Sequence, residues 1–461
     1  MNWLYHKSPI FIQNFLISLY GYYWKKRRFG KEFKEDLAKW KERETYSEKD
    51  WLLYQTNELR KLLVHSFDTV PYYHRVYKEH GFKREDFLNF ELEDLKSLPY
   101  LEKEDLRKYG KTELLSKKRN KGRFYASSGS TGTPVNIYIS KEFHRKWNAA
   151  YEVRVRNWAG VNYKMARGMI GGRKILKNDK SKGPFYRFNS AEKQTYFSAY
   201  HISEKNVSEY LKAFEENKIE YLVGYAMSNY FLADFIEKSG LKAPKLKAVI
   251  TSSEKLTPEM RATFKRVYGC KTFDSYSGVE SCGLISEDDV GNFLFSPDTG
   301  IIEVLNKNLK EVSDGDLGEV VSTGLLNFDQ PLIRYRIGDS ARKSKDQIVR
   351  SNIAMPVFDE IMGRVEDVII TSDGKKMVRF HSIFIDIVGL VFGQIVQKSM
   401  NDFALNLVVG KNYDKTISER ILKKRMNTQL GEITIKINYL DEAPKNNNGK
   451  FRAVISEVVN E

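Results

Sequence analysis

The chain has 461 residues, which is too long for one ordinary hydrophobic core and predicts two or three domains. Hydrophobic residues make up 41% of the chain and aromatic residues 13%, which excludes wholesale disorder, and two cysteines are too few for a disulfide framework or a four-thiolate zinc site. The formal charge of +16 favours anionic partners, but the basic residues are spread along the chain, so a nucleic-acid-binding function is not predicted.

Residues 1–30 combine aromatic side chains with a basic cluster. Residues 9–24 are rich in Ile, Phe, Leu, Tyr and Trp, and Lys25-Lys26-Arg27-Arg28 follows directly. The apolar run is shorter than the about 20 residues that a membrane-spanning helix needs, and it lacks the cleavage site of a secretory signal. Polar residues also interrupt it at Gln13, Asn14 and Ser18. Two interpretations stay open: residues 9–28 lie on an anionic membrane surface, or they form a helix that packs on the protein's own core.

The rest of the chain divides by its hydrophobic pattern. Residues 31–115 carry apolar residues at helical spacing, as in Leu59, Leu62 and Leu63, and are predicted to be mostly helical. From about residue 122, short apolar runs alternate with helical patterns, which indicates an α/β sheet. The predicted strands are 124–126, 221–224, 248–250 and 271–273, and the predicted helices are 207–217 and 228–239.

The last third of the chain has a different hydrophobic pattern. Residues 293–345 are predicted to be rich in strands, with glycines at regular intervals. After Arg364 a smaller unit is predicted. Its elements are strands at 403–409 and 433–439 and a helix at 417–426.

A loop rich in serine, threonine and glycine follows the predicted strand 124–126. Its sequence is Ser127-Ser128-Gly129-Ser130-Thr131-Gly132-Thr133-Pro134. The two glycines allow a tight turn that brings backbone N–H groups close to a ligand, and the hydroxyl groups are suitable donors to phosphate oxygens. It is not a Walker A motif, because no Gly-Lys-Ser/Thr follows. By itself the loop predicts either a phosphate-binding site or a flexible linker.

Two further motifs each place one carboxylate close to a glycine. In Tyr276-Ser277-Gly278-Val279-Glu280, the aromatic ring offers a face on which adenine can stack, and the carboxylate suits Mg²⁺, which prefers oxygen ligands. The alternative for this motif is a glycine turn with a surface glutamate. In Tyr335-Arg336-Ile337-Gly338-Asp339, the aspartate can accept two hydrogen bonds from the hydroxyls of a ribose.

Two short motifs complete the set. Gly363-Arg364-Val365-Glu366-Asp367 lies where the smaller unit begins, and Gly449-Lys450 lies in the polar, asparagine-rich stretch 445–450. Such a stretch is typical of an exposed loop, in which a lysine is ordinarily only solvated.

The five motifs, in this order and spacing, resemble those of the adenylate-forming superfamily of acyl-CoA synthetases and adenylation domains, and within it the phenylacetate–CoA ligase family. The most similar branch is the one found with capsule and other surface-polysaccharide biosynthesis. The resemblance covers about residues 90–461 and extends to the aromatic, basic N-terminus. It implies an α/β fold with a large, multi-subdomain N-terminal adenylate-forming core (31–362), a hinge (363–367) and a small, mobile α+β C-terminal domain (368–461).

The resemblance also implies a role for each motif. The serine–glycine loop would wrap the β- and γ-phosphates of ATP, Tyr276 would stack on adenine, Asp339 would bind the ribose hydroxyls and Arg364 would contact the nucleotide near the domain junction. The implied nucleotide-binding residues are Ser127, Ser128, Gly129, Ser130, Thr131, Gly132, Thr133, Ser253, Glu254, Tyr276, Ser277, Gly278, Asp339, Arg364 and Lys450. The implied catalytic residues are Thr131, Glu280, which would hold Mg²⁺, and Lys450, a mobile lysine that reaches the site during adenylation.

The chain departs from the family pattern at two places. The hinge residue is Glu366, where relatives usually have Asp or Lys, and the loop before Lys450 is unusually rich in asparagine. A carboxylate is kept at the hinge, so we expect the hinge to function. Gly224-Tyr225 lies where the family builds its acyl pocket, but this region does not name the acid.

The implied reaction is the ATP- and Mg²⁺-dependent activation of a carboxylic acid as an acyl-adenylate. Coenzyme A is the expected acceptor of the acyl group. Two alternatives stay open: transfer directly to an amine such as that of an amino sugar, or a non-catalytic, membrane-associated scaffold. We expect a cytoplasmic protein that is either free or peripheral on the inner face of the cytoplasmic membrane, and the sequence does not predict its oligomeric state.

Overall fold

The computed structural model describes most of the chain. The described residues are 5, 7–126, 135–173, 175–176, 182–254, 256–347, 353–362, 369–371, 376–377, 380, 383–384, 387–410, 412–441, 444 and 453–458. The predicted loop 127–134, the predicted hinge 363–367 and Lys450 lie outside them.

A sheet of twelve strands forms the centre of the large domain, in the order β11-β12-β13-β14-β10-β9-β8-β7-β6-β3-β5-β4. Five neighbouring strands in it are parallel, and β4 (Tyr186–Asn189) is an antiparallel edge. The parallel strands are β3 (Arg167–Gly171), β5 (Gln194–Ser198), β6 (Tyr221–Tyr225), β7 (Ala248–Ser252) and β8 (Lys271–Tyr276). The α/β sheet predicted from the sequence is therefore confirmed.

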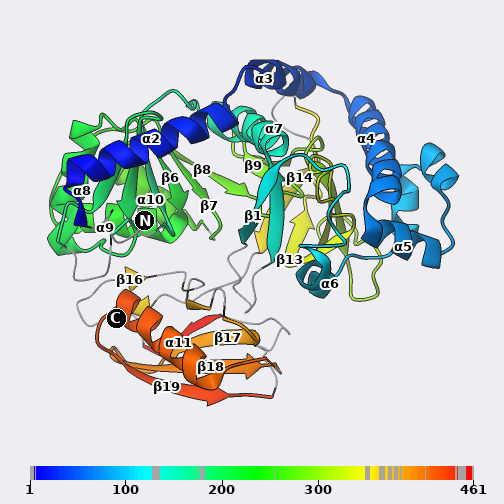
Figure 1. Ribbon diagram of the computed structural model, residues 1–461. Helices are drawn as coiled ribbons and strands as arrows, with labels where there is room; N and C mark the ends of the chain where they lie inside the picture. The colour runs from blue at the N-terminus through cyan, green and yellow to red at the C-terminus, as the bar shows by residue number, and fades with distance from the viewer. Residues whose placement is uncertain are drawn as a thin grey trace.

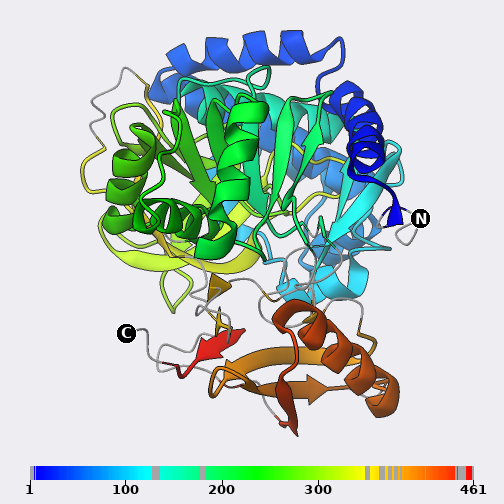
Figure 2. The ribbon, with the colours of Figure 1, turned by 90° about the vertical axis from the view of Figure 1, so that its left-hand side faces the viewer.

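Helices cover both faces of these parallel strands, as crossover connections require. On one face lie α8 (Val207–Glu216), α9 (Ala226–Lys238) and α10 (Pro258–Tyr268), which Figure 2 shows in front of the strands. On the other face pack α3 (Phe33–Glu42) and α7 (Lys141–Tyr151). Because both faces are buried, β6 and β7 read as nearly continuous apolar runs in the sequence.

The remaining strands of the sheet are antiparallel, and four of them, β10 to β13, lie in the part 293–345 that was predicted to be rich in strands. They are β9 (Ile285–Glu287), β10 (Phe293–Phe295), β11 (Gly300–Leu305), β12 (Leu317–Gly324), β13 (Tyr335–Lys343) and β14 (Val357–Met362). The predicted strand 124–126 belongs to a separate two-stranded hairpin of β1 (Gly122–Ala126) and β2 (Asn136–Ser140), in which β1 is largely exposed.

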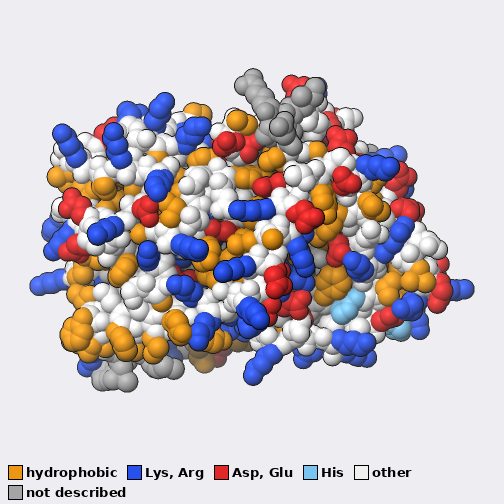
Figure 3. All heavy atoms as spheres, turned by 90° about the horizontal axis from the view of Figure 1, so that it is seen from above, with side chains coloured by type: hydrophobic (Ala, Val, Ile, Leu, Met, Phe, Trp, Pro, Cys, Tyr) orange, Lys and Arg blue, Asp and Glu red, His pale blue; other side chains and the backbone are white. Residues whose placement is uncertain are grey.

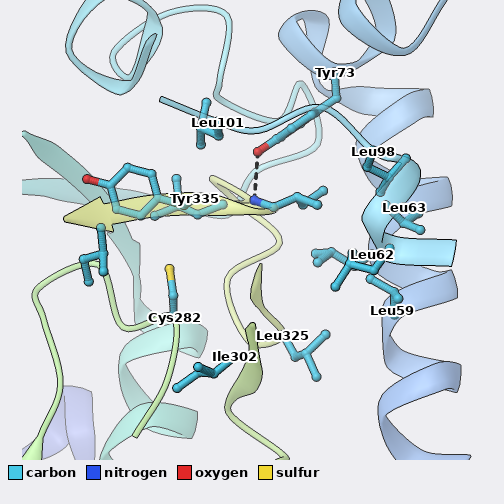
Figure 4. Packing of buried hydrophobic residues seen from close by; sticks show 14 of the residues in the cluster. Leu59, Leu62, Leu63, Tyr73, Leu98, Leu101, Cys282, Ile302, Leu325 and Tyr335 are labelled. Carbon is cyan, nitrogen blue, oxygen red and sulfur yellow. Dashed lines mark hydrogen bonds between the residues drawn. The ribbon is translucent and has the colours of Figure 1, made fainter. Parts of the chain in front are cut away.

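The predicted helical region packs beside this antiparallel half, and Figure 1 shows α4 and α5 to the right of its strands. Its α-helices after α3 are α4 (Glu48–Thr69), α5 (Pro71–Glu79) and α6 (Lys103–Tyr109). Leu59, Leu62 and Leu63 are fully buried against it, as their helical spacing predicts (Figure 4). The Tyr73 hydroxyl accepts a hydrogen bond from the backbone N–H of Ile333 at 3.0 Å, so α5 is tied to the chain just before β13.

A group of buried charges joins the helical region to the sheet. Asp298 is fully buried and accepts a hydrogen bond from Arg43 Nε at 2.7 Å, while Arg154 Nη2 lies 3.6 Å away from it. Arg154 is also fully buried and pairs with Glu44 at 2.8 Å. Two arginines far apart in the sequence therefore share one fully buried carboxylate, and Arg154 has Glu44 as a second partner.

The aromatic N-terminal segment forms helix α2 (Ile10–Arg28), which lies along edge strand β4 (Figure 1). The polar side chains in its first half face the protein. Asn14 Oδ1 accepts a hydrogen bond from the N–H of Phe188 at 3.1 Å, and Ser18 Oγ accepts one from the N–H of Ser190 at 3.0 Å. Within the described residues, no helix is both long and apolar enough to cross a membrane.

The C-terminal part forms a small sheet of its own, in the order β19-β18-β17-β20. Its strands are β17 (Leu390–Gln397), β18 (Asp402–Val409), β19 (Thr434–Tyr439) and β20 (Val454–Ser456), and α11 (Lys415–Leu430) packs on it. Two predicted strands and one predicted helix of this unit are thus confirmed. Figures 1 and 2 both show it below the large domain.

Candidate functional site

The carboxyl ends of the parallel strands bring the predicted site residues to one edge of the sheet. Tyr225 at the end of β6 is paired with Ser252 at the end of β7, and Ser252 is paired with Ser275 on β8. The segments 253–254 and 277–280 follow these ends directly. In open α/β sheets ligands bind outside the carboxyl ends of the strands, so this edge is where a ligand is expected.

Tyr276 and Asp339, which belong to two different motifs, are joined directly at this edge. The Tyr276 hydroxyl donates a hydrogen bond to Asp339 Oδ2 at 2.8 Å. Burial, and then the charge of Asp339, raise the pKa of the Tyr276 hydroxyl well above its ordinary value, so it keeps its proton and remains a donor. The bond holds the aromatic ring and the carboxylate in one fixed arrangement.

A bulge in β13 directs Asp339 to this position. Arg336 pairs with Val321 and Ser340 with Glu319, so the register between β13 and β12 shifts across Gly338. Gly338 has a φ of +86°, a conformation that glycine adopts without strain. Strict alternation would place Asp339 on the same face as the buried Tyr335, and the bulge removes that constraint.

Glu280 is buried at the end of the loop after β8. Its carboxylate lies back over Gly278, since a Cβ added to Gly278 would come within 2.4 Å of Glu280 Oε2. A side chain at Gly278 would therefore push Glu280 away. One carboxylate suits Mg²⁺, which is usually held by one or two carboxylates together with substrate phosphates. Glu280 thus fits the predicted role, which remains a prediction.

The loop after β7 is tied to the start of α9. Glu254 Oε2 accepts a hydrogen bond from the backbone N–H of Met227 at 2.9 Å, in the first turn of that helix, where a negative charge is favourable. Ser253 has a φ of +73°, which is uncommon for a residue other than glycine. Such strain is often found at ligand sites, and here it lies beside the predicted adenine position.

Sequence analysis did not find Asp274, which lies at the same edge. Its Oδ1 accepts hydrogen bonds from Thr251 Oγ1 and from the N–H of Ser275, both at 2.9 Å. Burial raises the pKa of the Asp274 carboxyl to about 7. The signal that could have revealed it is its position two residues before Tyr276, because alternate residues of a strand share a face.

The raised pKa of Asp274 predicts how Asp274→Asn changes stability with pH. Between about pH 4 and pH 7 the folded protein keeps a proton on Asp274 that the unfolded chain releases. The free energy of unfolding of the natural protein therefore falls as the pH rises through this range. Asn keeps the accepting oxygen but cannot ionise. Relative to the natural protein, the variant should therefore gain stability from pH 5 to pH 8. We expect a gain of about 2 kcal/mol over this range, less than the full linkage because part of the pKa shift lies below pH 5.

Urea unfolding at several pH values measures this difference. Asp50→Asn is the matched control: hydrogen bonds from Ser47 lower the pKa of Asp50, so this carboxyl is ionised in both the folded and the unfolded chain above about pH 5, and its difference should not change with pH in this range. A difference for Asp274→Asn that does not change with pH would show that the carboxyl ionises normally.

The ends of β3 and β6 form the region predicted to bind the acyl group. Gly224 has a φ of +133°, and a Cβ there would lie 1.8 Å from the carbonyl oxygen of Ile170, so only glycine allows this approach of the two strands. A Cβ on Gly172 would lie 2.8 Å from the Tyr225 hydroxyl, and the Tyr200 hydroxyl donates to the Gly172 carbonyl at 3.2 Å. Tyrosine side chains therefore surround the end of β3.

Several predicted site residues lie outside the described residues, and their roles stay predictions. They are Ser127, Ser128, Gly129, Ser130, Thr131, Gly132, Thr133, Arg364, Glu366 and Lys450. The structure brings together Tyr276, Gly278, Glu280 and Asp339 at one edge, with Ser253 and Glu254 on the neighbouring loop.

The chain is similar to curated proteins along almost its whole length. It is 25% identical over 470 residues to Protein CapK of Staphylococcus aureus, in an alignment that covers 99% of this chain and 100% of that protein. It is 28% identical over 347 residues to phenylacetate-coenzyme A ligase of Pseudomonas putida, in an alignment that covers 69% of this chain and 71% of that ligase. The family model of the CapK C-terminal domain matches residues 369–457. The chain is thus homologous to CapK and to phenylacetate-coenzyme A ligases.

Solved structures share the fold. 2-Hydroxyisobutyryl-CoA ligase in complex with 2-HIB-AMP and CoA in the thioesterification state matches with a TM-score of 0.57 at 18% identity, over 90% of this chain and 91% of that one. The same ligase in the postadenylation state, with R3-HIB-AMP, matches with a TM-score of 0.56 over the same shares. The predicted adenylate-forming fold, with a small C-terminal domain, is therefore confirmed.

Proposed function

We propose that this homologue of CapK and of the phenylacetate-coenzyme A ligases is an AMP-forming ligase that activates a carboxylic acid with ATP and transfers the acyl group to the thiol of coenzyme A. The observation that carries the proposal is the 2.8 Å hydrogen bond between Tyr276 and Asp339. It joins an aromatic ring to a carboxylate that could accept hydrogen bonds from a ribose diol, at the edge of the sheet where a ligand is expected and beside the buried Glu280.

The arrangement suits a nucleotide. The Tyr276 ring offers a face for adenine, and Asp339 keeps acceptor capacity for the ribose hydroxyls, because only one of its oxygens receives the tyrosine hydrogen bond. Glu280 would hold Mg²⁺, which when bound neutralises charge on the phosphates.

In the proposed reaction the substrate carboxylate attacks the α-phosphorus of ATP, and the bond to pyrophosphate breaks. The negative charge that develops is what a preorganised cation in a water-poor site would stabilise, and Lys450 is the proposed donor. Transfer then joins the acyl carbon to the acceptor sulfur and releases AMP and a proton. We further propose that the product serves surface-polysaccharide biosynthesis in the cytoplasm, a proposal that the whole-length similarity to CapK supports.

Pyrophosphate release from ATP, measured across a panel of carboxylic acids with and without coenzyme A, tests the function. We expect release that depends on one class of acid and stops in excess chelator, and a thioester that forms only when coenzyme A is present. Pyrophosphate release that no acid in the panel stimulates, or activity that persists in excess chelator, would contradict the proposal.

Asp339→Ala should weaken ATP binding by roughly 1.5–3 kcal/mol, the range for hydrogen bonds to a charged group. Calorimetric titration with ATP measures the loss. Tyr276→Phe is the matched control: it keeps the ring but removes the hydrogen bond to Asp339, so it should change affinity much less. If the two variants lose the same affinity, the role of Asp339 is only to hold Tyr276.

A further inference from the structure

Helix α2 exposes most of its large apolar side chains and turns Gln13, Asn14 and Ser18 toward the protein, the reverse of an ordinary surface helix. Phe11 is 72% exposed, Phe15 66% and Leu19 58%, whereas Gln13 is only 5% exposed. The other large exposed side chains of the helix are Ile10, Leu16, Tyr20, Tyr22 and Tyr23. We call these eight residues the outer face of α2. Figure 3 shows orange side chains in a row along the lower left edge, where α2 lies.

The inner face of α2 is fixed to the protein by specific contacts. Gln13 Oε1 accepts a hydrogen bond from Arg187 Nε at 2.7 Å, and Asn14 and Ser18 bind N–H groups beside edge strand β4. Gly21 touches Asn189 so closely that an added Cβ would lie 2.2 Å from its Oδ1. The helix also covers the polar groups of a sheet edge that would otherwise attract another strand. These contacts determine which face of α2 points outward.

The charged side chains of the helix itself have one sign. Residues 5–31 contain no Asp or Glu, and Lys25 and Lys26 are both exposed at the end of the helix. Lys26 Nζ lies 4.7 Å from the centroid of the Tyr22 ring on the outer face itself. Aromatic side chains beside cations suit the headgroup region of an anionic bilayer.

We propose that the outer face of α2 docks the folded protein on an anionic membrane surface, with the helix lying in the plane of the interface. This inference does not depend on the proposed reaction. A second copy of the chain fits the surface less well, because a two-fold interface would bring the same basic cluster close to itself, with no carboxylate on α2 to neutralise it.

Vesicle flotation with the full-length protein tests the proposal. The protein should float with vesicles of phosphatidylcholine and phosphatidylglycerol, should float poorly with phosphatidylcholine alone, and should detach as salt is raised. Phe15→Ser/Leu19→Ser should lower the partition coefficient by at least about tenfold, because burying even one such side chain is worth about that much. Lys26→Gln should lower it by about fivefold.

Matched controls come from α4, which also exposes two apolar residues. Leu52 is 56% exposed and Leu53 60%, so Leu52→Ser/Leu53→Ser removes similar side chains from another surface and should leave flotation unchanged. Lys49→Gln is the corresponding charge control. Equal loss in the α2 and α4 variants, or no flotation of the natural protein, would overturn the proposal. The proposal would also be overturned if analytical ultracentrifugation showed that the natural protein is a dimer and that only the α2 variant is a monomer.

A site-specific probe gives the orientation directly. A fluorophore on Leu19→Cys should be quenched by nitroxide-labelled lipids, and one on Leu53→Cys should not. The two native thiols are buried, and burial raises the pKa of Cys270 to about 11 and that of Cys282 well above its ordinary value, so labelling of the folded protein is selective. Equal quenching at both positions would contradict docking through α2.

Discussion

Lys450→Ala should lower the rate of adenylate formation by on the order of 10²–10³, the loss seen when one preorganised transition-state donor is removed. The lysine is expected to act on charge that develops at the α-phosphate. It should therefore contribute little to ground-state binding, and ATP affinity should change much less than the rate. Lys450 lies outside the described residues, so kinetics provide the test of its role.

Two half-reactions of the same variant separate this role from general nucleotide binding. Pyrophosphate release from ATP and acid should fall, whereas thioester formation from a supplied acyl-adenylate should be retained. Lys445→Ala, in the same asparagine-rich stretch, is the matched control and should leave both rates nearly unchanged. An equal loss in both half-reactions, or in neither, would rule out the mobile-lysine assignment.

Asp298→Asn should lower the free energy of unfolding by about 3–5 kcal/mol, because it leaves buried positive charge without its partner. The substitution keeps the shape of the side chain but removes the charge that faces Arg43 at 2.7 Å and Arg154 at 3.6 Å. Glu44 also pairs with Arg154 and would offset part of this loss. Urea unfolding followed by circular dichroism measures the change.

The matched control is an exposed ion pair. Arg75 and Glu79 lie 3.7 Å apart with both side chains largely in solvent, so Glu79→Gln should change stability by less than about 0.5 kcal/mol. If Asp298→Asn cost no more than this control, the buried charges would not depend on Asp298 for neutralisation.

Most elements of the fold were predictable because their signals are local. The spacing of Leu59, Leu62 and Leu63 predicts a helix whatever it packs against, and the apolar runs of β6 and β7 predict buried strands. The order of strands was not predictable. Phe293 of β10 pairs with Phe358 of β14 from a distant part of the chain, and no local pattern records such a partner.

The orientation of α2 was not predictable from composition either. Gln13, Asn14 and Ser18 read as interruptions of an apolar run, because hydrophobic patterns assume that the apolar face packs inward. The partners of Asn14 and Ser18 at the edge strand are backbone N–H groups, which every sequence has. Hydrogen-bonding capacity thus decided the inner face, and the sequence analysis could leave both interpretations of this segment open but could not choose.

The candidate site was predictable as far as its motifs are contiguous. Tyr276 and Asp339 were each predicted to contact a bound nucleotide, and the structure adds the hydrogen bond between them. Asp274 was missed because its unusual pKa arises from burial, which depends on neighbours brought in from β7 and β9. The bulge at Gly338 was visible only as a glycine before an aspartate.

The distance in sequence between α2 and β4 sets an order of events during synthesis. Arg28 ends α2, and β4 begins at Tyr186, about 160 residues later. At about 5–20 residues per second, a ribosome needs roughly 8–30 s to make the intervening chain. During that interval the polar side of the nascent helix lacks its main partner, since the strand that binds Asn14 has not yet been translated. The hydrophobic side of α2 is thus available to a bilayer or a chaperone long before its place on the finished domain exists.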